Sequence, residues 1–353
     1  MADKIKVTID GRELEATPGE TILEVCKRNN IHIPTLCYHP KLSIVGACRV
    51  CVVEMKGARA LVTACSTPVE RDGTVIFTNN ERVKNARRLV VELLLASGNH
   101  NCLTCEANGN CELQNLVYEL GIEQPRFEPD PPGYEIETSN PFIIRDLNKC
   151  ILCGRCVRGC NEIQVNQVID FGYRGHKTKV VTANDQEYIN SNCVFCGECV
   201  SLCPTGALIE KMGRFAGRPW ELKKVRTICS YCGTGCTIEL NVKDNKVVKV
   251  TSAEGGVNNG SLCVKGRFGH DYIHHPDRLT KPLIKKNGEF VETSWDEAID
   301  YTAKRLMDIK KQDGPDSIVG ISSARCTNED NYLMQKFMRA VIGTNNVDHC
   351  ARL

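Results

Sequence analysis

Hydrophobic and polar positions alternate at the start of the chain, where polar residues separate Ile5, Val7 and Ile9. Such a period of two is typical of a strand that buries one face. The Asp-Gly pair at residues 10–11 favours a tight turn, and Leu14 is expected in a returning strand. The pattern therefore predicts a β-hairpin.

Two segments after the hairpin have helical patterns. Residues 17–20, Thr-Pro-Gly-Glu, match a capping box with proline at the first helical position, so a helix is expected from there to about Asn29. A second, amphipathic helix is predicted over residues 82–98 and ends at Gly98, because glycine is favoured at a helix C-terminus.

Strand and helix patterns also occur in the C-terminal third. Residues 236–242 and 246–250 are expected to form strands, and a helix is expected to start at Trp295. Residues 317–343 have the pattern of a strand followed by a helix, which is one β/α unit. Together these patterns predict an α+β multidomain fold.

Composition narrows the class of protein. The 353 residues carry a formal charge of +2, and the apolar share of 42% and charged share of 25% are ordinary for a globular protein. Aromatic residues make up only 6% and no basic cluster stands out, so nucleic-acid binding is not expected. The longest apolar run, residues 89–96, is interrupted by Glu92 and is too short for a transmembrane segment. With no hydrophobic signal sequence, a cytoplasmic location is expected.

Cysteine is the unusual feature, with 22 in the chain. Thiols of a long cytoplasmic protein stay reduced, which favours metal ligation over a disulfide framework. Nineteen of them fall into five closely spaced groups, and Cys26, Cys326 and Cys350 are left over. These three are predicted to be buried small hydrophobic residues or inert thiols.

Groups three and four carry the most specific signal, because each has the spacing C-x2-C-x2-C-x3-C. In this ferredoxin pattern the fourth cysteine ligates the other cluster. We therefore expect two neighbouring [4Fe-4S] clusters; a pair of zinc knuckles is disfavoured, since those usually include histidine. The first cysteine set is Cys150, Cys153, Cys156 and Cys203, and the second cysteine set is Cys160, Cys193, Cys196 and Cys199.

The first two groups precede this pair. The flanking spacing of group one suits a [2Fe-2S] centre, and the hairpin and helix before it predict a β-grasp ferredoxin domain. Its ligands are expected to be Cys37, Cys48, Cys51 and Cys65. Group two has three cysteines, and the nearest imidazole is a candidate fourth ligand of a [4Fe-4S] cluster. The ligands of this second site would be His100, Cys102, Cys105 and Cys111.

Group five has a different spacing and predicts a separate [4Fe-4S] cluster. Its ligands would be Cys229, Cys232, Cys236 and Cys263. Lys265 follows the last of them by two residues. From the residues alone it is either a solvated lysine or a charge between the cluster and an adjacent redox cofactor.

The order of these groups is similar to a known family. The segment HNCLTCEANGNCELQ, residues 100–114, resembles the [4Fe-4S] module with one His and three Cys ligands that the complex I large iron-sulfur subunit, iron-only hydrogenases and cytosolic formate dehydrogenases share. The family usually places the histidine four residues before the first cysteine, and that position is Gly98 here.

Two later segments favour formate dehydrogenase among these relatives. CSYCGTGCTIEL and CVKGRFG, which begin at Cys229 and Cys263, resemble the [4Fe-4S] domain of molybdopterin oxidoreductases. The resemblance implies a molybdenum or tungsten bis(pterin guanine dinucleotide) cofactor in the complete enzyme, with Lys265 as the residue on the electron path between the cluster and a pterin.

The resemblance implies the following domains. They are a β-grasp [2Fe-2S] ferredoxin domain (1–78), a helical [4Fe-4S] module with one His and three Cys ligands (79–120), a linker (121–139), a bacterial-type 2[4Fe-4S] ferredoxin domain (140–212), a molybdopterin oxidoreductase [4Fe-4S] domain (222–278) and the beginning of its cofactor domain (279–353).

The function implied is the iron-sulfur electron relay of a formate dehydrogenase, which converts formate to CO2. Its expected partners are flavin- and NAD(P)-binding subunits or hydrogenase-type subunits. The alternative is a non-catalytic, multi-cluster electron-transfer subunit of a complex I-like or hydrogenase assembly. Residues 344–353 resemble the segment that precedes the metal-ligating Cys or selenocysteine of formate dehydrogenases, so we hypothesise that the sequence was cut at a selenocysteine codon.

Overall fold

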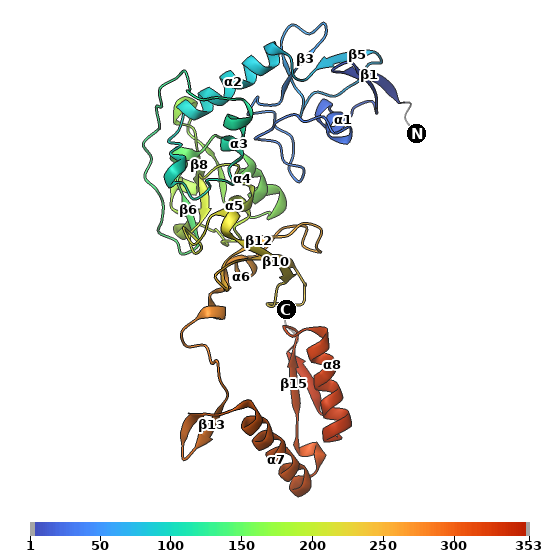
Figure 1. Ribbon diagram of the computed structural model, residues 1–353, viewed down its shortest axis with the longest axis vertical. Coiled ribbons are helices and arrows are strands. Elements are labelled where there is room, and N and C mark those ends of the chain that lie inside the picture. Colours follow the sequence, from blue (N-terminus) through green and yellow to red (C-terminus); the bar gives the residue numbers. More distant parts are fainter. Residues whose placement is uncertain (1–3, 351–353) are drawn as a thin grey trace. The chain divides into compact units, whose positions relative to one another are not determined.

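The computed structural model describes residues 4–350. The chain forms two compact units, one that extends to Lys223 and one that starts at Lys224 (Figure 1). Each unit contains both helices and strands, as expected for an α+β multidomain protein.

The first unit begins with a five-stranded mixed sheet in the order β2-β1-β5-β3-β4. The predicted hairpin is confirmed, because β1 and β2 pair antiparallel with Val7 opposite Leu14. The core of this sheet includes Val7, Ile9 and Ile76, all at most 1% exposed. The strands are β1 (Ile5–Ile9), β2 (Arg12–Ala16), β3 (Val52–Met55), β4 (Val62–Thr63) and β5 (Thr74–Phe77).

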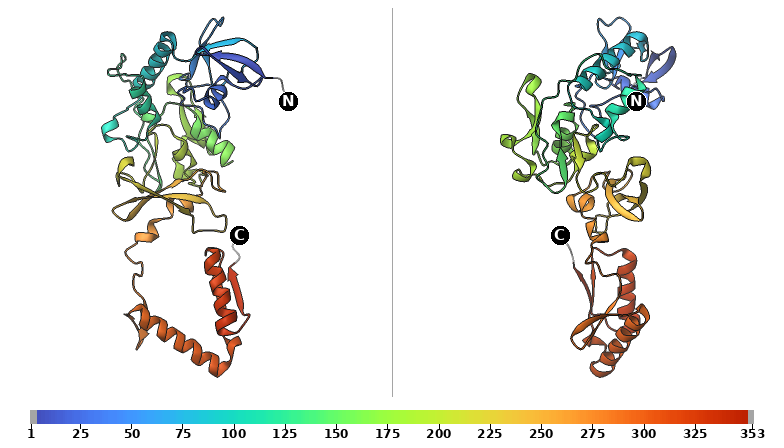
Figure 2. Two further views of the ribbon diagram at one scale, coloured as in Figure 1. Left: turned by 45° about the vertical axis from the view of Figure 1, so that its right-hand side comes forward. Right: turned by 60° about the vertical axis from the view of Figure 1, so that its left-hand side comes forward.

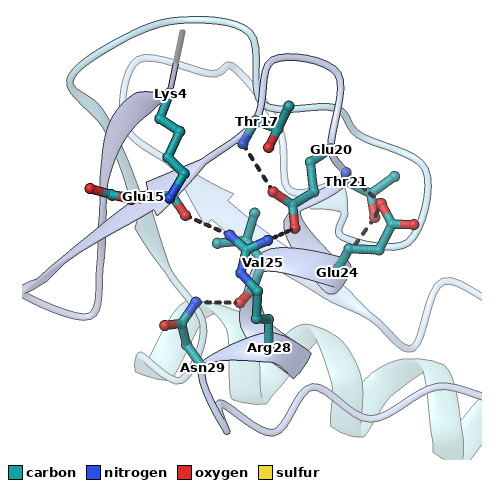
Figure 3. A network of polar contacts seen from close by, with 9 residues as sticks. All are labelled: Lys4, Glu15, Thr17, Glu20, Thr21, Glu24, Val25, Arg28 and Asn29. Atoms are coloured by element: carbon teal, nitrogen blue, oxygen red, sulfur yellow. Dashed lines mark hydrogen bonds and ion pairs between the residues drawn. The ribbon is translucent and has the colours of Figure 1, made fainter. Parts of the chain in front are cut away.

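The first helix, α1, spans Ile22–Arg28, so the prediction that it opens at residues 17–20 is wrong. Gly19 has φ +88°, which no helix accepts, and the Glu20 carboxylate instead accepts a hydrogen bond from the Thr17 N–H (3.0 Å) in a turn. The capping box lies four residues later. The Thr21 hydroxyl accepts from the Glu24 N–H, and the Glu24 carboxylate accepts from the Thr21 N–H at 2.8 Å (Figure 3).

The rest of the first unit is mainly helix and loop. The amphipathic helix is confirmed as α2 (Glu81–Ala96), which ends just before Gly98. In the middle region Cys156 lies on α4 and Cys199 on α5, two short helices with a left-handed glycine before each. The elements are α3 (Glu112–Glu119), β6 (Ile143–Arg145), α4 (Arg155–Arg158), β7 (Ile169–Gly172), β8 (Lys179–Thr182), α5 (Glu198–Leu202) and β9 (Leu208–Glu210); β6 pairs with β9 and β7 with β8.

The predicted linker, residues 121–139, does not stay free of the neighbouring structure. Glu137 pairs with Arg145 through the backbone in both directions and through a buried ion pair of 2.6 Å. The end of the segment therefore contributes to the core of the region that follows, which its acidic composition did not indicate.

The described part of the second unit, which ends at Cys350, contains three separate small sheets. The strands predicted at 236–242 and 246–250 are β11 and β12, the helix predicted at Trp295 is α7, and the predicted β/α unit is β15 and α8. Both views of Figure 2 show α8 alongside β15. The elements are β10 (Lys223–Ile228), β11 (Thr237–Lys243), β12 (Lys246–Ser252), α6 (Val264–Phe268), β13 (Leu283–Lys286), β14 (Glu289–Glu292), α7 (Trp295–Asp313), β15 (Gly320–Ser323), α8 (Asn328–Lys336) and β16 (Val347–Cys350).

The three ungrouped cysteines have different surroundings. Cys26 is fully buried in the core behind the first sheet, as predicted. Cys326 and Cys350 are exposed, which excludes the buried alternative for these two and leaves inert thiols as the prediction. Cys326 lies in the turn after β15, and Cys350 ends the two-stranded sheet of β15 and β16.

We expect iodoacetamide at about pH 8 to modify Cys326 but not Cys26 in the folded protein, because the thiolate is the reactive form. Burial, followed by the charge of Asp10, raises the pKa of Cys26 from 9.0 to about 12. The pKa of Cys26 is thus higher in the folded than in the unfolded protein. The protonated thiol therefore stabilises the folded state below about pH 9, and this stabilisation is lost as the pH rises toward 12. Peptide mass spectrometry measures the modification; equal rates at the two thiols would contradict the expectation.

Among residues 4–350, no helix is long and apolar enough to cross a membrane.

Candidate metal centres

The four thiols of group one converge beside the first sheet. All are at most 9% exposed, and the N–H groups of Cys37 and Cys48 each point at the other residue's sulfur, at 3.4 and 3.5 Å. Hydrogen bonds from Cys48 and Cys65 lower the pKa of Cys37, and one from Cys65 lowers the pKa of Cys51. The same bonds, together with burial, raise the pKa of Cys48 and of Cys65. The four sulfurs therefore lie within hydrogen-bonding reach of one another, as ligands of one centre must.

The first cysteine set surrounds one cavity. Cys150, Cys153, Cys156 and Cys203 all line it, although Cys203 is far from the others in sequence. Burial raises the pKa of Cys150 to about 11 and of Cys153 to about 12. A buried space lined by four sulfurs and otherwise mainly apolar side chains fits a cubic iron-sulfur cluster.

The second cysteine set is arranged in the same way. Burial first, and then the proximity of Cys196, Cys193 and Cys160, raises the pKa of Cys199, so these four sulfurs are neighbours. The two sets also share a local geometry. Leu152 and Phe195 both have left-handed backbones, with φ +53° and +51°, and donate N–H bonds of 3.4 Å to the sulfurs of Cys150 and Cys193.

This repeated geometry is visible in the sequence. Ile151-Leu152-Cys153-Gly154 and Val194-Phe195-Cys196-Gly197 are equivalent, and both glycines have positive φ. N–H bonds to sulfur stabilise negative charge there, so each half of the repeat is suited to an anionic cluster.

Group two lies in the loop between α2 and α3. Cys102 and Cys111 are both close to Cys105, and burial is the main cause that raises the pKa of Cys111 to about 11. This loop lies against the ferredoxin-like region, the part of the chain that carries groups three and four. A Cβ on Gly206 of that region would stand 2.5 Å from the Cys105 sulfur. Only glycine permits this approach.

His100 is held close to the same loop. Its Nε2 lies 3.1 Å from the Leu94 carbonyl oxygen, and burial lowers its pKa, which favours the neutral ring. A neutral imidazole that donates one N–H to a carbonyl can ligate metal through its other nitrogen. A Cβ on Gly98 would stand 2.6 Å from His100 Nε2, so the imidazole fills the space that a side chain at position 98 would need.

Two arginines of α4 connect groups one, two and three of the first unit, and sequence reasoning did not single them out. Arg155 forms an ion pair with Glu112 of α3 and donates to the Tyr38 carbonyl at 2.8 Å. Arg158 donates to the Cys37 carbonyl at 2.7 Å and to the Cys153 carbonyl at 3.1 Å. Both arginines are at least 92% buried, and a buried arginine is a signal only once the fold is known.

Group five lies in the second unit. Cys229, Cys232 and Cys263 are all close to Cys236, although Cys232 and Cys263 are exposed. Lys265 is in α6 and lines the same pocket as Cys229. A hydrogen bond to Thr234, and to a smaller extent the charge of Lys265, lower the pKa of Cys232.

In the described part of the chain, no three His, Cys, Asp or Glu side chains converge in the arrangement that a single metal ion needs.

Comparison with protein families assigns a domain to each region. The 2Fe-2S iron-sulfur cluster binding domain matches residues 2–81, the NADH-ubiquinone oxidoreductase-G iron-sulfur binding region 87–126 and the 4Fe-4S dicluster domain 149–207. The molybdopterin oxidoreductase Fe4S4 domain matches residues 222–275, and the molybdopterin oxidoreductase domain matches 278–353. The chain therefore carries the Fe4S4 domain and part of the molybdopterin domain of molybdopterin oxidoreductases. It joins them to one 2Fe-2S domain and further 4Fe-4S domains.

Curated oxidoreductases are similar to this chain over nearly its whole length. The alpha subunit of the NADPH-Fe(3+) oxidoreductase of Geobacter sulfurreducens is 41% identical over 99% of this chain and 40% of its own length. A putative formate dehydrogenase of Staphylococcus aureus (strain USA300) is 36% identical over 100% of this chain and 39% of its own. The chain thus spans about 40% of the length of these relatives.

A solved structure is also similar to this chain. The NAD+-reducing [NiFe]-hydrogenase in its H2-reduced state contains a chain with a TM-score of 0.56 and 32% identity. The match covers 60% of this chain and 90% of that one. The iron-sulfur region is therefore of a kind that also occurs in a hydrogenase complex.

Proposed function

We propose that this chain is the iron-sulfur relay of a formate dehydrogenase. It would hold one [2Fe-2S] cluster on the four thiols of group one and four [4Fe-4S] clusters on the remaining groups, with His100 as a ligand of the second site. The single observation that carries the proposal is the cavity lined by all four thiols of the first cysteine set. Bound clusters would supply one-electron transfer, and the chain supplies their positions and surroundings.

The arrangement of the first unit supports a relay. Arg158 donates to carbonyls of two ligand residues from different groups, Cys37 and Cys153, and Gly206 brings Cys105 against the ferredoxin-like region. Clusters held by these groups would be neighbours, which electron transfer requires. Lys265 would lie on the path between the group-five cluster and a pterin in the full-length protein.

The full-length protein would bind a molybdenum or tungsten bis(pterin guanine dinucleotide) and oxidise formate to CO2. The 36% identity to a putative formate dehydrogenase supports this activity. Partners that bind flavin and NAD(P), or hydrogenase-type subunits, are supported by the similarity to the NADPH-Fe(3+) oxidoreductase and the hydrogenase. A cytoplasmic location remains a prediction.

Metal analysis of the anaerobically purified chain tests the relay, and should find about 18 iron atoms per chain with visible iron-sulfur absorbance. Zinc at a comparable ratio without that absorbance would refute it. Formate-dependent dye reduction by the full-length native protein tests the catalytic part. Dye reduction only with partner proteins would favour a non-catalytic relay. The similarity to a hydrogenase chain supports this alternative. Sequencing the gene beyond the codon for Leu353 tests the selenocysteine hypothesis.

A further inference from the structure

Tyr188 is a fully enclosed tyrosine of the first unit, with 1% of its surface exposed. Its backbone N–H donates to the Glu137 carboxylate at 2.7 Å, and the Arg145 guanidinium lies 4.7 Å from its ring centroid. Glu137 and Arg145 form a buried ion pair of 2.6 Å. The backbone and the ring of Tyr188 are therefore both held in place by charged groups.

The hydroxyl of Tyr188, unlike its backbone and ring, is not held by a charged group. Within residues 4–350 it is buried and has no hydrogen-bond partner. A buried hydroxyl without a partner is costly, and the buried hydroxyl of tyrosine is usually paired. The site is thus built for a partner that is not one of the described protein groups.

The surroundings of Tyr188 identify the class of that partner. Tyr188 lines the cavity enclosed by Cys150, Cys153, Cys156 and Cys203. Burial, and then the thiols of Cys199 and Cys156, raise its pKa well above the usual value, so the phenol keeps its proton and remains a donor. Cys156 belongs to the first cysteine set and Cys199 to the second, so Tyr188 lies near ligands of both.

We propose that the Tyr188 hydroxyl donates a hydrogen bond to a sulfur of the cluster in the first cysteine set and raises the reduction potential of that cluster relative to its neighbour. The inference rests on the proposed cluster ligation. A donor to sulfur stabilises the more negative, reduced cluster, and hydrogen bonds to sulfur are one of the determinants of cluster potential. Tyr188 is not oxidised or deprotonated; it sets which of two adjacent clusters holds the electron.

The variant Tyr188→Phe tests this, because it removes only the hydroxyl. We expect unchanged iron content, a downward shift in the potential of the first-set cluster in an EPR-monitored redox titration, and a smaller shift or none in the second. The control is Tyr173→Phe, since Tyr173 is an exposed tyrosine of the same region whose hydroxyl donates to Asp185 at 2.8 Å. It should leave both potentials unchanged.

A second measurement uses the unaltered protein. Pulsed ENDOR of the reduced cluster in H2O and D2O should show a coupled exchangeable proton in the wild type that the Tyr188→Phe variant lacks. Unshifted potentials in Tyr188→Phe would overturn the inference, as would wild-type protein without that proton. If the variant loses iron, ENDOR of wild-type protein that carries oxygen-17 in the phenol group of its tyrosines decides, because an oxygen-17 coupling to the reduced cluster would identify the Tyr188 hydroxyl and its absence would overturn the inference. Wild-type protein without any [4Fe-4S] signal would instead refute the proposed function.

Discussion

Cys203→Ser is expected to remove about four iron atoms and to leave the same spectrum of remaining clusters as Cys150→Ser. The two residues lie far apart in sequence but line one cavity. Loss of either thiol should therefore destabilise the same cluster, whereas Cys193→Ser should affect the neighbouring one, whose thiols surround Cys199.

Iron analysis and low-temperature EPR of the three variants measure this result. If each run of four cysteines held its own cluster, Cys203→Ser would resemble Cys193→Ser and not Cys150→Ser, which would contradict the crossed pairing. Cys26→Ser is the matched control. Cys26 is fully buried in the apolar core and belongs to none of the five cysteine groups, so its replacement should leave the iron content unchanged.

His100→Ala is expected to cause a loss of similar size, about four iron atoms, from the cluster held by the loop of residues 102–111. Three cysteines alone leave one corner of a cubic cluster without a protein ligand. His100 is neutral and held by the Leu94 carbonyl, and Gly98 leaves the room that its ring occupies. The loss should be specific, with the other four clusters retained.

EPR and iron analysis also measure this second loss, with His176→Ala as control because His176 is exposed in another loop. Retention of all iron in His100→Ala would show that the fourth ligand is a different residue. The alternative to examine is Gln114, whose side chain forms a hydrogen bond with Cys102. A cluster lost in Gln114→Ala and kept in His100→Ala would assign the role to Gln114.

The start of the first helix shows where local patterns mislead. Residues 17–20 and residues 21–24 both contain threonine followed three residues later by glutamate, and in both the glutamate carboxylate accepts from the threonine N–H. Only the second pair begins a helix, because Gly19 takes a positive φ within the first. The two adjacent segments share this one type of contact, and the backbone conformation decides which of them caps the helix.

The sequence by itself determined the hairpin, the amphipathic helix α2 and the grouping of the cysteines, because each depends on residues close together in the chain. Tertiary structure alone decided what surrounds those groups. Gly206 meets Cys105, Arg158 connects Cys37 to Cys153, and Tyr188 faces the cavity of the first cysteine set. These contacts join residues from separate segments, and a glycine, an arginine or a tyrosine has no spacing pattern. Their roles exist only once folding has buried them beside the thiols.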